Sequence, residues 1–168
     1  GRLFIGVADD GTIKGVKSED EEKYMIEKAA TFYAKPMLEP IFEEIYIDEK
    51  LVLVVDILKS EQKPHYSLSE DKKWWVYIRV KDKSVLASKI VVDVLRKEYQ
   101  EEGVLINYSS KEKALLEYLE KNERITLKEY AAMLNLSRRR ASRIMVDLIL
   151  AGVIRIHTTE KEEFYTAS

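Results

Sequence analysis

The sequence of 168 residues contains no cysteine, only three prolines and six glycines, and only two histidines. Without cysteine the chain can form neither disulfide bonds nor thiolate metal sites, and this absence says nothing about the cellular compartment. His65 and His157 are isolated in the sequence, so they give no support to a histidine metal site or a Ser-His-Asp triad. We predict neither a metal nor a cofactor.

Long apolar runs are missing as well. No run approaches the ~20 residues that a transmembrane helix needs, and nothing resembles a secretory signal. The composition is 46% hydrophobic and 35% charged. We therefore expect a soluble, cytoplasmic protein of one or two domains with no membrane partner. The chain opens without methionine on an apolar stretch, Leu3 to Val7, and we expect residues upstream of it to be missing.

The net charge of −2 is spread unevenly. From Lys111 onward there are 11 basic and 9 acidic residues, a balance of +2, whereas the preceding residues have 17 and 21, a balance of −4. These values do not by themselves indicate a nucleic-acid-binding protein. Any such binding would depend on a local basic patch.

The last third of the chain has the element order of a winged helix-turn-helix. An amphipathic helix over 111–122 is followed by a short strand, and Thr126 begins a second helix over 127–136 with a capping-box glutamate three residues later. Asn135 is the expected turn, Ser137 the cap of a third helix, and Gly152 its stop. Two strands, 153–156 and 163–167, then flank an expected wing loop.

The third helix has one apolar face and one basic face. Residues 141, 144, 145 and 148 share a face at helical spacing and are predicted to be buried. The arginines lie at the helix's N-terminal end, where the helix dipole disfavours cations. Phosphate or a guanine edge would favour them there. We predict duplex DNA as the partner, contacted by Ser137, Arg138, Arg139, Arg140, Ser142 and Arg143.

Two observations leave alternatives open for this helix. The expected wing is acidic, because Glu160, Glu162 and Glu163 outnumber Lys161, and a phosphate backbone would repel it. Val146 and Leu150 are expected to point outward, so the helix could instead pack on another domain or subunit. A plain solvated face is a further alternative for the arginines.

The first hundred residues predict an α+β domain. We expect a hairpin of strands 3–7 and 12–16, strands over 40–47 and 51–58, and a strand over 74–80. A helix over 21–34 and a helix over 89–100, capped by Ser88, complete it. The first helix has an expected buried stripe of Met25, Ile26, Ala29, Ala30 and Tyr33. The predicted division is residues 1–100, a linker over 101–110, and 111–168.

Three segments of this region, LFIGVADDGTIKGV, KPHY and YIRVKDKSVLA, occur in an order and spacing that resembles the Schlafen AlbA-like domain over roughly residues 1–99. The resemblance implies a mixed sheet with flanking helices, nucleic-acid or nucleotide binding, and the setting of a bacterial transcriptional regulator, often with a winged helix behind it. The family pattern also has an upstream strand and helix that this chain lacks. A glycine commonly follows YIRV, and Lys81 stands there instead.

A second basic surface is a candidate for nucleic-acid contact in this domain. Basic and aromatic side chains together suit phosphate contact and base stacking, and the chain offers Lys63, His65, Tyr66, Lys72, Lys73 and Arg79. The favoured alternative is structural: Pro64 and Tyr66 anchor a loop, and Trp74 and Trp75 flank a sheet edge.

An enzymatic interpretation is the main alternative to a regulator. Some Schlafen-type relatives are metal-dependent ribonucleases that use a carboxylate cluster, to which Asp9 or Asp10 could correspond. Aspartate is also favoured in a DDG turn for its hydrogen bonds to backbone, and the partner glutamates lie in the upstream segment. No phosphate-binding GxxxxGK[ST] motif occurs. We therefore expect no catalysis from these residues, and a nuclease would need that upstream segment.

The prediction is an α+β protein in which a winged helix-turn-helix binds DNA as a transcriptional regulator. The AlbA-like domain would assist binding, sense a ligand such as a nucleotide, bind RNA, or form a homodimer. A protein-interaction or nucleotide-binding module is the remaining alternative.

Overall fold

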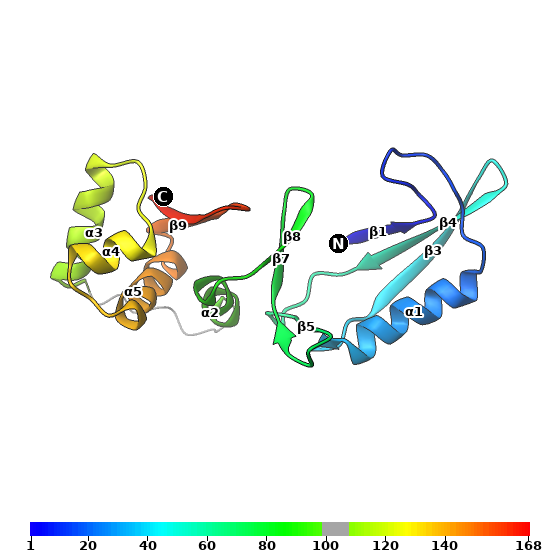
Figure 1. Cartoon of the computed structure of the whole chain (residues 1–168), viewed down its shortest axis with the longest axis horizontal. Coiled ribbons are helices and arrows are strands. Elements are labelled where there is room, and N and C mark those ends of the chain that lie inside the picture. Colours follow the sequence, from blue (N-terminus) through cyan, green and yellow to red (C-terminus); the bar gives the residue numbers. More distant parts are fainter. Residues whose placement is uncertain (99–107) are drawn as a thin grey trace. The chain divides into compact units, whose positions relative to one another are not determined.

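The computed structural model describes residues 1–98 and 108–168, which form helices and small antiparallel sheets (Figure 1). The predicted α+β class is confirmed. The described residues divide into two compact units, Gly1–Trp75 and Val76–Ser168. None of the described helices combines the length and the apolar character that a membrane crossing needs.

A three-stranded antiparallel sheet forms the centre of the first unit. Its strands β1 (Arg2–Ile5), β4 (Lys50–Ile57) and β3 (Pro40–Ile47) lie in the order β1-β4-β3. Val52 to Val55 of β4 are at most 2% exposed. The continuous apolar run therefore predicted the central strand correctly, because successive side chains of this strand are buried on both faces of the sheet.

The predicted hairpin of strands 3–7 and 12–16 is wrong. β1 pairs with β4, and the second segment contributes only one bridge, between Val7 and Ile13. The rest of it is a loop fastened to Gly6 by backbone hydrogen bonds. Gly6 has φ +93°, and a Cβ there would lie 3.0 Å from the backbone of Gly15. Glycines thus allow a close backbone approach that replaces a regular ladder.

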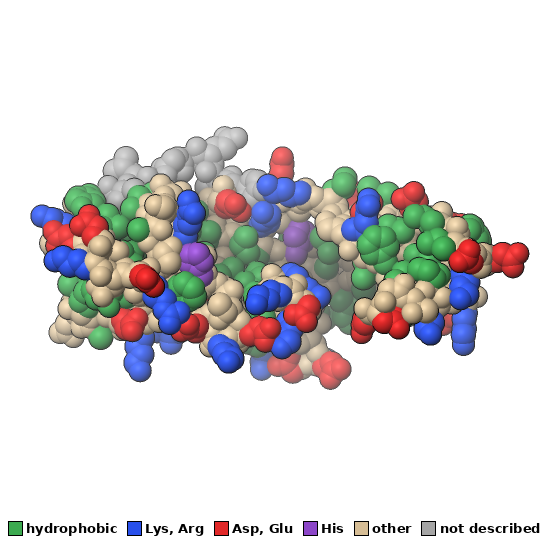
Figure 2. All heavy atoms as spheres, turned by 90° about the horizontal axis from the view of Figure 1, so that it is seen from above, with side chains coloured by type: hydrophobic (Ala, Val, Ile, Leu, Met, Phe, Trp, Pro, Cys, Tyr) green, Lys and Arg blue, Asp and Glu red, His purple; other side chains and the backbone are tan. Residues whose placement is uncertain are grey.

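Helix α1 (Glu19–Phe32) begins at its cap Ser18, whose side chain accepts a hydrogen bond from the Glu21 N–H. The predicted buried stripe is only partly correct, because Ala30 is buried whereas Met25 and Tyr33 are 57% and 48% exposed. The helix packs mainly along β2 (Ala34–Lys35) and β3, so little of its circumference is covered. On the face drawn in Figure 2, hydrophobic side chains gather over this unit.

The predicted single strand 74–80 is divided at Val76. Its first part is β6 (Trp74–Trp75), which joins β2 and β5 (Tyr66–Leu68) in a small sheet. Its second part is β7 (Tyr77–Val80), which forms a hairpin with β8 (Lys83–Leu86) in the second unit. Val76 is itself buried, at 5% exposure.

The second unit contains the predicted winged helix-turn-helix. Thr126 and Glu129 form the expected capping box, Asn135 takes φ 49° in the turn, and Ser137 caps the third helix. The expected short strand before the second helix is a single bridge from Ile125 to Tyr165. The elements are α3 (Ser110–Lys121), α4 (Leu127–Met133), α5 (Arg138–Leu150), β9 (Ile154–Thr158) and β10 (Glu163–Ala167).

Helix α2 (Lys89–Lys97), capped by Ser88 as predicted, packs against α5 within the second unit. Ile90 is 2% exposed and belongs to the hydrophobic core of the winged helix, with Val94 packed beside it. Lys97 forms an ion pair of 3.2 Å with Asp147. The division at residues 100 and 110 stays a proposal, and residues 101–107 of the proposed linker lie outside the described residues.

The β7–β8 turn contains a lysine in a backbone conformation that favours glycine. Lys81 has φ 55°, a left-handed conformation that favours glycine, and it follows β7 directly in a two-residue turn. Lys81→Gly should therefore raise the free energy of unfolding by about 0.5–1 kcal/mol, after the entropic cost of glycine is subtracted. Chemical denaturation would measure the change. Asp82→Gly, at the neighbouring position, is the control; an equal gain there would contradict the argument.

Candidate nucleic-acid interface

The buried face of α5 is the predicted one. Ala141, Met145 and Leu148 are at most 1% exposed, and Ile144 is 9% exposed. The Ser137 side chain accepts a hydrogen bond of 3.3 Å from the Arg140 N–H and fixes where the helix begins. The arginine-rich segment is thereby held as the first turns of α5.

The arginines of this segment are exposed and have no hydrogen-bond or ion-pair partner in the described part of the chain. Arg138, Arg139, Arg140 and Arg143 all lie in the exposed class. Within residues 1–98 and 108–168, no hydrogen bond or ion pair involves their guanidinium groups. The helix dipole disfavours cations at this end, and no ion pair within the described residues offsets that cost. The segment is therefore available to an external anion.

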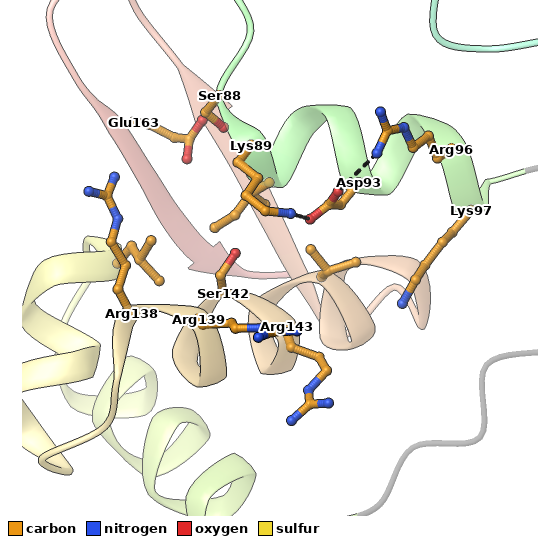
Figure 3. Close-up of a pocket in the computed structure, with 13 residues that line it drawn as sticks. Ser88, Lys89, Asp93, Arg96, Lys97, Arg138, Arg139, Ser142, Arg143 and Glu163 are labelled. Carbon is orange, nitrogen blue, oxygen red and sulfur yellow. Dashed lines mark hydrogen bonds and ion pairs between the residues drawn. The ribbon is translucent and has the colours of Figure 1, made fainter.

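Part of α5, around Ser142 and Val146, is covered by α2. The prediction that Val146 points outward is wrong, since it is 2% exposed, and Leu150 is half-buried. Ser142 is only 9% exposed and is directed toward α2 (Figure 3). The physical reason is the packing of Ile90 and Val94 of α2 into the same hydrophobic core as Val146. The partner that the sequence left open for this face is thus a helix of the same unit.

Two of the three acidic side chains of the wing form ion pairs with cations outside it. Glu160 pairs with Lys83 of β8 at 2.7 Å, and Glu162 pairs with Arg124 at 2.7 Å. Glu163 accepts a hydrogen bond from the Tyr165 hydroxyl, and burial is the main cause that raises the pKa of this phenol. Exposed ion pairs contribute little to stability. They do place a cation beside two of the carboxylates that would repel phosphate.

A cleft of about 750 Å³ lies between α2 and α5. Its lining includes six basic and two acidic residues, although the whole chain has a net charge of −2. Arg138, Arg139 and Arg143 line it from α5. The cations that α2 contributes, Lys89, Arg96 and Lys97, were not among the predicted site residues. The sequence did contain a signal for them: two cations follow Lys89 by seven and eight residues, which places all three on one face of an amphipathic helix.

The second predicted surface is divided between the two units. Five of its residues lie in the first unit, whereas Arg79 lies in β7 of the second. His65 Nδ1 lies 2.9 Å from the Pro36 carbonyl oxygen, and Lys73 forms an ion pair of 2.8 Å with Asp71. Contacts of this kind fit the structural alternative, in which the loop is anchored. The other residues of this predicted surface that lie in the first unit are Lys63, Tyr66 and Lys72.

The DDG segment forms the predicted turn. Asp10 Oδ1 accepts a hydrogen bond of 2.8 Å from the Thr12 N–H. Hydrogen bonding with the Thr12 side chain, and then with its N–H, lowers the pKa of the Asp10 carboxyl. Such a bond is the usual reason for aspartate in a turn. Across residues 1–98 and 108–168, no three His, Asp or Glu side chains converge into a possible metal site.

Comparisons with known proteins find a family for each part of the chain. The model of the family described as Schlafen, AlbA_2 matches residues 1–88. The model described as winged helix-turn-helix DNA-binding matches residues 109–155. The resemblance noted in the sequence and the fold of its C-terminal part are both confirmed. No curated protein and no solved structure gives a significant match.

The packing of α2 on α5 can be tested by truncating Ile90. Ile90→Ala should lower the free energy of unfolding by about 2–4 kcal/mol, because it leaves a cavity in the winged-helix core. Thermal or chemical denaturation measures it. Leu86→Ala, at a position that is 49% exposed on β8, is the control and should cost far less. Equal costs would contradict the described packing.

Proposed function

Because the chain belongs to the Schlafen AlbA_2 family and its C-terminal part matches a winged helix-turn-helix DNA-binding model, we propose that it is a transcriptional regulator. In this proposal the first turns of α5 contact duplex DNA. The element order of the second unit supports it, since winged helices of this kind present the N-terminal end of the third helix to the major groove.

The observation that carries the proposal is the set of uncompensated arginines at the start of α5. Arg138, Arg139 and Arg143 are exposed, and none has an ion pair in the described part of the chain. A guanidinium group can bind a phosphate or the O6/N7 edge of a guanine with two hydrogen bonds. These contacts would replace the intramolecular partner that the arginines lack.

The ion pairs of the wing make its acidic residues more compatible with nearby DNA than the sequence alone indicates. Lys83 and Arg124 accompany Glu160 and Glu162, so a duplex that reaches the wing would meet paired charges. The proposal therefore assigns most of the DNA affinity to α5 and a minor part to the wing.

The first unit has a supporting role in this account. The family supports a nucleic-acid-related function for it, and a second DNA contact, RNA binding or a homodimer interface are proposals. A cytoplasmic location stays a prediction.

The proposal is tested by removing the three arginines together. Arg138→Ala/Arg139→Ala/Arg143→Ala should weaken binding to a labelled duplex of random sequence by at least about a hundredfold at low salt, because each charge-assisted contact contributes about 1–3 kcal/mol. The dependence of log Kd on log salt should also flatten, by about 0.9 for each lost phosphate contact. Fluorescence anisotropy measures both.

A matched control removes the same charge elsewhere. Lys28→Ala/Lys113→Ala/Lys121→Ala changes exposed lysines on α1 and α3, and it should leave duplex affinity nearly unchanged. Circular dichroism would establish that both variants are folded. If the arginine variant binds like the wild type, or if the two variants lose affinity equally, the assignment to α5 is wrong.

A further inference from the structure

The cleft between α2 and α5 is, we propose, a binding site for a nucleoside phosphate. This site goes beyond the proposed function, since a small ligand would occupy it whether or not α5 also contacts DNA. Three features of the lining support it: its size, its charge and its apolar floor.

The size of the cleft suits a small molecule better than a duplex. A helix with its side chains is about 10–12 Å across, and the major groove is about 12 Å wide, so α2 and α5 cannot enter one groove side by side. A duplex that receives the first turn of α5 alone would therefore not fill the space between the two helices. Its volume of about 750 Å³ falls within the ~300–1,000 Å³ that is usual for small-molecule sites.

The charges around the cleft select an anion. Arg138 and Arg139 lie at the N-terminal end of the 13-residue α5, and neither has an ion pair or hydrogen bond to another described residue. Lys89 faces the cleft from α2 and, among the described residues, is paired with Asp93 four residues further on (Figure 3). Phosphate groups placed there would also interact favourably with the positive end of the helix dipole.

The floor of the cleft selects an organic body attached to those phosphates. Leu127 lines it half-buried from α4, and most of the accessible surface of the lining is apolar, although Ile90 and Val146 behind it are each only 2% exposed. An inorganic phosphate would leave this apolar surface in contact with water. A nucleobase would cover it, and burial of apolar area stabilises the complex by about 25 cal/mol for each Å².

The test uses the whole chain and ATP as the probe. A ribose-labelled fluorescent ATP analogue should bind saturably, as followed by anisotropy. Unlabelled ATP should displace it at a concentration at least about tenfold lower than either pyrophosphate or adenosine, because only ATP meets both the cations and the floor. Pyrophosphate as potent as ATP, or the absence of saturable binding, would overturn the proposal.

Two single substitutions locate the site. Lys89→Gln removes an exposed lysine that faces the cleft and should weaken ATP binding about fivefold to tenfold. Lys113→Gln breaks an equivalent exposed i,i+4 pair, with Glu117 on α3, and should have no effect. Equal losses in the two variants would show a general charge effect and overturn the assignment to the cleft.

A parallel titration with duplex DNA separates this proposal from the proposed function. If the duplex binds and ATP does not, only the cleft assignment fails. If ATP binds in the described pattern and the duplex does not, the cleft stands and the proposed function fails. Where both bind, ATP should weaken duplex binding, because both ligands use Arg138 and Arg139.

Discussion

The packing of α2 against α5 is the interaction on which the rest of the second unit depends. Ile90 enters the core that Val146 and Met145 help to form, so α2 is part of the winged helix in a structural sense. This contact covers part of α5, around Ser142 and Val146, and leaves the arginines at its N-terminal end exposed. It also creates the basic cleft, because two cation-bearing helices are held side by side.

The same packing divides α5 along its length. Its C-terminal half is buried on most sides, from Ile144 to Leu148, whereas its first turn carries exposed arginines. Burial of apolar side chains stabilises the helix and so holds cations at the end where its dipole disfavours them. An arrangement of this kind has a local electrostatic cost that an anionic ligand would offset. This is the physical link between the fold of the unit and both proposed ligands.

Local signals in the sequence predicted much of this structure. Ser88, Thr126 and Ser137 were identified as helix caps, and the caps, the turn at Asn135 and the apolar face of α5 are all as predicted. These features depend on residues close together in sequence, where capping and periodicity act directly.

The errors concern contacts between distant segments. Nothing near Val146 in the sequence shows that α2 covers it, and nothing near Leu3 shows that its strand pairs with β4 instead of the following segment. The exposed Met25 has the same cause, since helical periodicity shows which residues share a face and not how much of that face is covered. The α2 cations could not be predicted as part of the site, because they line the cleft only when α2 packs on α5.

The most direct test of the account is a backbone amide NMR titration of the chain with duplex DNA. The account predicts that the largest shifts occur from Ser137 to Arg143, with smaller shifts in the wing, and that the buried turn around Val146 changes little. Shifts confined to the first unit, Gly1–Trp75, would contradict the claim that α5 is the DNA-binding element.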